Sequence, residues 1–322
     1  MRRIGDGVAC RSEGDGAPRG IPGSLIDREE LDMDFGIVFA NTGPFAGGEA
    51  AAAFAVAAEE AGFESLWTVE HVVVPSGYQS EYPYSPTGKM PGPEESDIPD
   101  PLIWLSYLAG VTSTIKLATG ILILPQRNPV VLAKECATLD SLSNGRLLLG
   151  VGVGWLEEEF DAIGVPFRER GRRTDDHIAA MRALWTEDKA SHHSEFTNFD
   201  NCILRPNPAQ GSVPIHVGGH TDAAARRAGR LGDGFFPGKG SHEELARLFE
   251  VARTTAKDNG RDPDAIEFSS GGDGAIGENA LDEVKALADL GVTRVILPAF
   301  LFWNDTADAL ARYGDEVIAR SN

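Results

Sequence analysis

Cysteine, basic residues and long apolar runs are scarce in this chain, and each shortage excludes a class of protein. The 322 residues include three cysteines, Cys10, Cys136 and Cys202, too few and too widely spaced for a disulfide scaffold. We interpret them as free thiols in a reducing cytoplasm. Lys and Arg number 29 against 49 Asp and Glu, so the net charge is −20. Nucleic acids and anionic membranes attract basic surfaces, so neither is an expected partner.

Membrane spans, export signals and metal motifs are missing as well. No apolar run approaches the roughly 20 residues needed to cross a bilayer. No apolar stretch follows Arg2-Arg3, as it would in a secretory signal. His242-Glu243 lacks the second histidine of a zinc-binding H-E-x-x-H motif. We therefore expect no metal site and no membrane segment.

Residues 1–32 differ from the rest of the chain. They are rich in glycine and charge and have no apolar period, whereas a clean strand begins after Met33. The pattern predicts a poorly ordered extension over residues 1–32, followed by a single domain over residues 33–322. The alternative is an arm that packs on a partner subunit.

The segment from Leu117 to Phe167 is the most informative. Two almost wholly apolar strands, Lys116–Leu124 and Arg146–Val153, indicate a parallel sheet covered on both faces. Between them a helix over Val130–Ser143 ends at Asn144-Gly145. Together they form a βαβ unit, in which the helix places four residues on one buried face: Leu132, Cys136, Leu139 and Leu142.

Strands and helices alternate from Met33 onward. The predicted strands are Phe35–Ala40, Ser65–Val69, Lys116–Leu124, Arg146–Val153, Val213–Val217, Gly234–Phe236, Ile266–Ser270 and Arg294–Pro298. The predicted helices are Gly48–Gly62, Pro101–Ser113, Val130–Ser143, Glu169–Thr186, Asp222–Leu231, Glu243–Asn259, Ala280–Leu290 and Thr306–Ala319. Eight of each predict an α/β fold, a (β/α)8 TIM barrel, with a doubly wound open sheet as the alternative. Insertions follow strand two, over Pro75–Pro101, and strand four, where Asp188–Ser212 is expected to be irregular.

Candidate functional residues follow the strands, where barrels keep their chemistry. Glu70-His71 ends strand two, and only one of the two side chains can face the barrel mouth. A histidine there can exchange protons near neutral pH, or it can merely hold the loop. The run Gly218-Gly219-His220-Thr221 precedes a helix, whose free amides suit a phosphate, although an ordinary glycine turn would look the same.

Three segments give the chain a family resemblance: SLWTVEHVVVP, ATGILILPQRNPVVLAKECATLDSLSNGRLLLGVGVGWLEEEFDAIGVPFRERGRR and VPIHVGGHTDAAARRAGRLGDGFFP. With them the chain resembles the luciferase-like monooxygenase superfamily, specifically its deazaflavin-dependent oxidoreductase branch, which uses coenzyme F-420. The resemblance extends from Met33 to the C-terminus. It implies a homodimeric barrel that binds the coenzyme, an 8-hydroxy-5-deazaflavin, and a small-molecule substrate at its C-terminal face.

The resemblance also implies roles for individual residues. It makes His71 the proton-handling catalytic residue, with Glu70 as the next candidate. It places the coenzyme against Thr119, Gly120 and Ile121, with a non-proline cis peptide in that strand. The remaining implied coenzyme contacts are Gly152, Gly154, Gly218, Gly219, His220, Pro237 and Gly238.

Trp155 and Phe39 are the implied substrate-pocket residues. The sugar-phosphate dehydrogenases of the family carry an acid where Trp155 stands, so the resemblance argues against sugar-phosphate oxidation and favours an apolar or aromatic wall beside the substrate. The basic run Arg168, Arg170, Arg172 and Arg173, or Arg127 alone, could meet the coenzyme's anionic tail or could belong to solvated surface.

The resulting hypothesis is an oxidoreductase that transfers a hydride between the deazaflavin and a small organic substrate. One alternative is an FMN-dependent monooxygenase of the same superfamily, which would use O2 and a separate flavin reductase. A second is a barrel that binds flavin or deazaflavin without catalysis, although a histidine at the barrel mouth argues against it.

Overall fold

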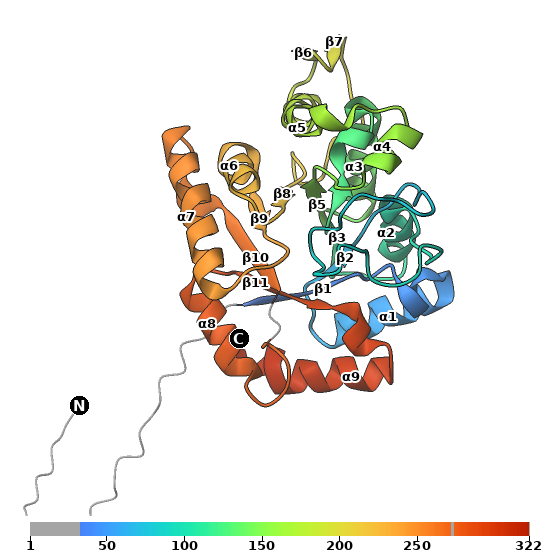
Figure 1. The fold of residues 1–322 in the computed structure, drawn as a ribbon, viewed down its shortest axis with the longest axis vertical. Helices are drawn as coiled ribbons and strands as arrows, with labels where there is room; N and C mark the ends of the chain where they lie inside the picture. Colours follow the sequence, from blue (N-terminus) through green and yellow to red (C-terminus); the bar gives the residue numbers. More distant parts are fainter. Residues whose placement is uncertain (1–32, 272–273, 322) are drawn as a thin grey trace, which may run out of the picture. The chain divides into compact units, whose positions relative to one another are not determined.

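The computed structural model describes residues 33–271 and 274–321. The extension expected over residues 1–32 lies outside the described residues and stays a prediction. Parallel strands form the centre of the fold, and helices lie outside them (Figure 1). The central strands are β1 (Asp34–Val38), β2 (Ser65–Thr68), β3 (Lys116–Thr119), β4 (Leu122–Ile123), β5 (Leu147–Gly152), β8 (Ile215–Gly218), β9 (Gly234–Phe236), β10 (Glu267–Gly271) and β11 (Arg294–Pro298).

These strands close into a ring. Each pairs in parallel with its neighbour, and β11 pairs back to β1 along its whole length. Both β3 and β4 pair with β5, so they fill one position of the barrel between them. Eight positions in a closed ring confirm the predicted TIM barrel and exclude the open sheet.

The longer helices follow the strands as the sequence predicts. They are α1 (Gly48–Glu60), α2 (Pro101–Ala109), α3 (Pro129–Leu142), α5 (Arg170–Thr186), α6 (Asp222–Leu231), α7 (His242–Asp258), α8 (Ala280–Asp289) and α9 (Thr306–Tyr313). Asp100 and Asn128 each precede a helix-starting proline and accept two backbone amides as N-caps. Short 3-10 turns occupy Gly43–Ala46, Leu124–Gln126, Phe167–Glu169, Pro263–Ala265 and Ala299–Phe302.

Four elements differ from the expectations. The predicted strand Lys116–Leu124 is interrupted at Gly120 and Ile121, whose peptide bond is cis, as the resemblance implied. Asp188–Ser212, expected to be irregular, contains the hairpin β6 (Ala190–His193) and β7 (Asn198–Cys202). Its strands are mostly polar and exposed, so no apolar alternation reveals them. The third difference is a short helix that the sequence did not predict, α4 (Glu157–Ala162). The fourth is the last helix, which was predicted to be continuous: α9 is followed by a π-helical turn over Gly314–Ile318 and then by α10 (Ala319–Ser321).

The prediction of a buried face on α3 is wrong for one of its four side chains. Leu132, Cys136 and Leu139 are buried as expected, but Leu142 is 76% exposed. Because Leu142 is the last residue of α3, the buried stripe ends one turn before the helix does.

Two clusters of buried apolar side chains fill the fold. The larger lies between strands and helices, and the smaller is contributed by strand residues that face the barrel interior. Trp67 is the largest member of the inner cluster, and nearby glycines leave space for it. A Cβ on Gly36 would lie 2.7 Å from Trp67 Nε1, so only glycine fits beside that indole.

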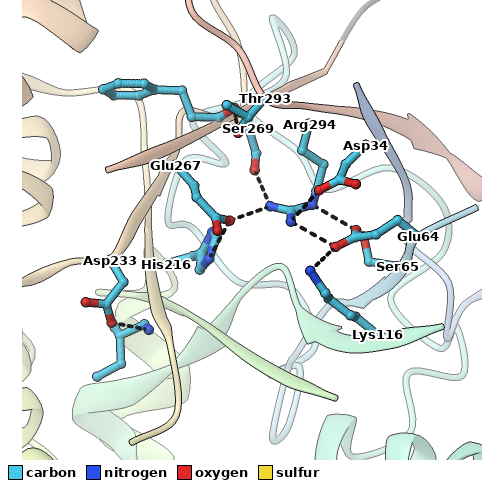
Figure 2. A network of polar contacts seen from close by, with 12 residues as sticks. Asp34, Glu64, Ser65, Lys116, His216, Asp233, Glu267, Ser269, Thr293 and Arg294 are labelled. Carbon is cyan, nitrogen blue, oxygen red and sulfur yellow. Dashed lines mark hydrogen bonds and ion pairs between the residues drawn. The ribbon is translucent and has the colours of Figure 1, made fainter. Parts of the chain in front are cut away.

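The first residues of several strands form a polar network at the N-terminal end of the barrel (Figure 2). Its centre is Arg294, whose side chain is 1% exposed and which binds both oxygens of Glu64 at 2.9 Å. Burial would raise the pKa of Glu64, but the charges of Arg294 and Lys116 lower it to about 2. We call this set the Arg294 network; its members are Asp34, Glu64, Lys116, His216, Glu267, Ser269 and Arg294.

Candidate functional site

Glu70 and His71 follow β2 after Val69, and their side chains have different surroundings. Glu70 is buried, and its carboxylate accepts the Ile123 amide at 2.5 Å and Arg127 Nε at 3.0 Å. Arg127 also binds Asp100, the N-cap of α2. Burial raises the pKa of Glu70, and the Arg127 charge opposes that shift. Glu70 therefore holds the β4 loop and Arg127 in place, and Arg127 is engaged within the chain rather than free for an anionic tail.

His71 faces a carboxylate from the helix that the sequence did not predict. Its Nδ1 lies 3.1 Å from Glu159 Oε2 in α4, and the two side chains are 8% and 0% exposed. The other oxygen of Glu159 accepts the amides of Val72 at 2.6 Å and Val73 at 3.3 Å. His71 Nε2 makes no hydrogen bond to any residue that the structure describes. The imidazole is thus fixed at one nitrogen and open at the other.

Aromatic rings gather beside this histidine: Trp155, which follows β5, contacts it, and tyrosines of the insertion after β2 contact Trp155. The Trp155 ring meets His71 edge-on, with centroids 5.6 Å apart. Tyr78 and Tyr82 lie against the same indole, at 5.4 Å and 5.1 Å. Tyr82 in turn contacts Tyr84, which reaches the opposite side of the barrel. We call Tyr78, Tyr82 and Tyr84 the tyrosine strap.

Three barrel positions meet around Ile121. A Cβ on Gly152 would lie 2.5 Å from Ile121 Cδ1, and a Cβ on Gly218 would lie 2.5 Å from Ile121 Cγ2. The half-buried Ile121 side chain therefore rests on the bare backbone at the ends of β5 and β8. Thr119 does not face the same space, because it is buried and donates to the Gly150 carbonyl at 2.6 Å.

The segment after β8 forms the opposite rim. Gly219 has φ +118, a conformation that other residues rarely adopt. His220 follows, and its Nδ1 is buried without a hydrogen-bond partner. Burial lowers the pKa of His220, and nearby Lys239 adds to the effect. Thr221 caps α6, so the first amides of that helix open beside His220.

Tyr84 connects this rim to the end of β9. Its ring centre lies 4.9 Å from that of His220, and a Cβ on Gly238 would lie 2.6 Å from Tyr84 Cε1. Gly238 and His220 thus border the same space under the tyrosine strap, while Pro237 beside Gly238 is buried. Lys239 donates to the carbonyl of Pro83, the residue between Tyr82 and Tyr84, and so anchors the strap to the segment after β9.

The remaining predicted residues are less closely associated with His71. Gly154 supports α4 and β4, because a Cβ there would lie 2.7 Å from Phe160 and 2.8 Å from Ile123. Phe39 follows β1 with φ +61 and packs against the outer core, with no ring contact to His71 or Trp155.

The basic run is largely engaged within the chain. Arg170 stacks on Phe167 and donates to the Gly154 carbonyl, whereas Arg172 and Arg173 pair with glutamates. Arg168 alone of the four is exposed without a charged partner among the described residues. These contacts support surface and loop roles for the run over a role in binding a coenzyme tail.

Glu159 and the tyrosine strap are the parts of the site that sequence reasoning missed. The contact between Glu159 and His71 joins residues 88 positions apart, and no local pattern reports such a distance. The available signal was the acidic run Glu157–Glu159 between Leu156 and Phe160, which places one acid on the buried side of a short helix. Within the described part of the chain, no cluster of three or more His, Cys, Asp or Glu could hold a metal ion.

Comparison with known proteins identifies related sequences. Residues 33–319 match the family model described as luciferase-like monooxygenase. An uncharacterized protein of Mycobacterium tuberculosis is 35% identical over 244 residues, which is 76% of this chain and 82% of that protein. The F420-dependent glucose-6-phosphate dehydrogenase of Kineococcus radiotolerans is 32% identical over 220 residues, 66% of this chain and 60% of that protein. The FMNH(2)-dependent dimethylsulfone monooxygenase of Pseudomonas putida is 36% identical over 157 residues, 48% and 43% of the two chains.

Solved structures share the fold. An F420-dependent secondary alcohol dehydrogenase, in complex with an F420-acetone adduct, has a TM-score of 0.72 at 17% identity and covers 89% of this chain and 99% of its own. At that identity the likeness supports the barrel architecture alone. No helix among the described residues is long and apolar enough to pass through a bilayer.

Proposed function

Since the chain belongs to the luciferase-like monooxygenase family, we propose that it is an oxidoreductase that transfers a hydride between a deazaflavin coenzyme, F-420, and a small organic substrate. The observation that carries the proposal is a fixed imidazole with a free Nε2 on one side of the barrel mouth, together with bare backbone and open helix amides at the ends of other strands. The similarity to an F420-dependent relative over two thirds of the chain favours the deazaflavin.

The residues of the barrel mouth fit such a coenzyme. Ile121, backed by Gly152 and Gly218, would support the flat ring where side chains would otherwise obstruct it. Gly219, His220 and the first amides of α6 would bind the phosphate, since a helix start favours anions and His220 Nδ1 lacks a partner. When bound, the coenzyme would supply the hydride chemistry.

His71 would handle the proton of the reaction. Oxidation of an alcohol carbon releases a hydride from carbon and a proton from oxygen, and reduction of a carbonyl needs both. A free imidazole nitrogen at the mouth can accept or return that proton. This role distinguishes the proposal from a barrel that binds the coenzyme without catalysis.

We infer that the substrate is flat and uncharged. Trp155, Tyr78 and Tyr82 line the approach to His71 with rings, and the nearest cations are already engaged. Lys89 donates to the Tyr78 carbonyl, and Arg127 pairs with Glu70. Arg127 is neutralised by Glu70, and Lys89 is the one cation against these rings in the described part of the chain, so the rings rather than a cluster of cations dominate the approach. A relative is nevertheless a glucose-6-phosphate dehydrogenase.

The FMN-dependent alternative is supported by a separate relative, the dimethylsulfone monooxygenase. Titration of the purified chain with oxidised F-420 and with FMN, followed by the quenching of cofactor fluorescence, separates the two functions. We expect F-420 to bind at least tenfold more tightly. Tighter binding of FMN, together with O2 consumption on addition of a flavin reductase, would overturn the deazaflavin assignment.

We also infer that the protein forms a homodimer through α2. Ile103 is 74% exposed, Tyr107 lies one turn further along the same face of α2, and Val111, just beyond the end of the helix, is exposed as well. Sedimentation of the Ile103→Glu variant tests this: a dimer should become a monomer. Cys136 and Cys202 are free thiols, which supports a reducing compartment such as the cytoplasm.

A further inference from the structure

Glu159 is the one fully buried carboxylate that contacts the proton-handling residue in the described part of the chain. It lies in α4, directly after the Trp155 turn, and reaches across to the exit of β2. No Lys or Arg among the residues that the structure describes pairs with it, so its hydrogen bonds to His71, Val72 and Val73 are what compensate its burial.

The two oxygens of Glu159 have separate partners. Oε1 accepts the Val72 and Val73 amides, which can only donate. Oε2 faces His71 Nδ1 at 3.1 Å. A carboxylate accepts hydrogen bonds, so this geometry places the proton of a neutral imidazole on Nδ1 and leaves the lone pair on Nε2.

We propose that Glu159 is a positioning residue that holds His71 in its Nδ1–H form and thereby makes Nε2 the proton acceptor of the reaction. The same carboxylate fixes the backbone that follows His71, so the ring's place and its tautomer have one cause. The inference rests on the proposed function for the role of Nε2, whereas the tautomer itself does not depend on any cofactor.

The Glu159→Gln variant tests the tautomer because the backbone decides how the amide sits. Val72 and Val73 require an acceptor, so the glutamine oxygen must take the place of Oε1. The amide nitrogen then faces His71 Nδ1 and donates to it. A neutral imidazole in that position carries its proton on Nε2 and can no longer accept one there.

Glu158→Gln is the matched control. Glu158 is the neighbouring residue in α4 and also binds the insertion, accepting the Gln79 and Ser80 amides at 2.6 Å and 3.1 Å. It does not touch His71. Replacing it removes an equal charge from the same helix and leaves the His71 contact intact.

The measurement is 15N NMR of the histidine rings in the full chain without cofactor, at an alkaline pH at which free imidazoles are neutral. We expect an unprotonated Nε2 for His71 in the wild type and in Glu158→Gln, and a protonated Nε2 in Glu159→Gln. A protonated Nε2 in the wild type would overturn the proposal without any variant, even if Glu159→Gln failed to fold. An unchanged tautomer in a folded Glu159→Gln would also overturn it.

Turnover separates this inference from the proposed function. Glu159→Gln should lower turnover by roughly 10²-fold or more, the scale expected when a catalytic imidazole is held in the wrong tautomer, with coenzyme affinity changed less than threefold. If the tautomer switches but turnover persists in both Glu159→Gln and His71→Ala, His71 is not the proton acceptor, and both the proposed role and the purpose assigned to Glu159 fail. If His71→Ala abolishes turnover while Glu159→Gln keeps it, only the positioning inference fails.

Discussion

The two ends of the barrel use buried charge in opposite ways. At the N-terminal end, Arg294 is surrounded by Asp34, Glu64 and Glu267, and every one of its nitrogens is bound (Figure 2). At the C-terminal end, His71 is held by Glu159 on one side and has a free nitrogen on the other. The first arrangement is complete within the chain, and the second leaves a group available to a ligand.

On this difference we assign stability to the N-terminal end and the proposed function to the C-terminal end. Removing one member of a closed network leaves the others buried and unpaired, which costs folding free energy. Removing a group whose open side faces a ligand affects binding or catalysis and leaves the core packed. TIM barrels place catalytic residues at the C-terminal face, and the contrast between Arg294 and His71 follows that division.

Arg294→Met is the change expected to reduce stability most. Glu64 and Glu267 would lose their main partner inside the barrel end, so the free energy of unfolding should fall by about 3–5 kcal/mol in urea titrations. F-420 affinity of the folded fraction should stay within threefold, since the opposite end is untouched.

Arg172→Met is the control for this experiment. Arg172 and Glu195 form an ion pair in which both side chains are more than half exposed, so its loss should cost less than about 1 kcal/mol. Equal losses in the two variants would contradict the assignment of stability to the Arg294 network.

Gly219→Asp should have the next largest effect, on affinity. The new carboxylate would stand at the start of α6, where the phosphate is proposed to bind, and should weaken F-420 binding by about 10- to 10²-fold. Gly219→Ala imposes the same strain at φ +118 without the charge. The difference between the two variants should shrink in high salt; if it does not, charge is not the cause.

Acid should lower the free energy of unfolding through His216, a member of the Arg294 network. Burial lowers the pKa of His216 from 6.5 to about 3, so between these pH values the imidazole is protonated in the unfolded chain and neutral in the folded one. Stability therefore falls as pH drops from about 6.5 toward 3, by at most about 1.4 kcal/mol per pH unit for this proton.

Urea unfolding between pH 7 and 5 measures this slope. His216→Gln should reduce it, while His193→Gln, at an exposed histidine, should not. Glu64 does not contribute in this window, because its shift acts only below about 4.5. Identical slopes in the wild type and both variants would show that His216 does not cause the loss of stability in acid.

Deleting residues 1–32 should have the smallest effect. The segment has no periodic apolar face, so melting temperature and F-420 affinity should both stay nearly unchanged. A fall of several degrees would show that the segment supports the barrel.

The sequence predicted most of the fold because apolar periodicity is local. The bounds of β9, β11 and α6 coincide with the predicted ones, since each is delimited by glycine, proline or a capping threonine. The hairpin β6–β7 was not predicted, because its strands are mostly polar and exposed and show no apolar alternation.

The site was predictable only in part. Strand-end position made His71 a candidate, and the resemblance made Gly152 and Gly218 candidates, which the structure brings together against Ile121. The partners of Glu70 and His71 lie 57 and 88 positions away in sequence, so no local pattern could assign one carboxylate to structure and the other to positioning.

The most direct test compares His71→Ala with Arg294→Met in two assays. Turnover is followed by F-420 absorbance, with aromatic alcohols for the oxidised coenzyme and aromatic carbonyl compounds for the reduced one, and stability is followed by urea unfolding. His71→Ala should lower turnover by about 10²- to 10⁴-fold and change the free energy of unfolding by less than about 1 kcal/mol. Arg294→Met should lower the free energy of unfolding by about 3–5 kcal/mol and leave the turnover of the folded protein nearly unchanged. A folded His71→Ala that retains turnover, or one that loses stability as Arg294→Met does, would contradict the division between the two ends.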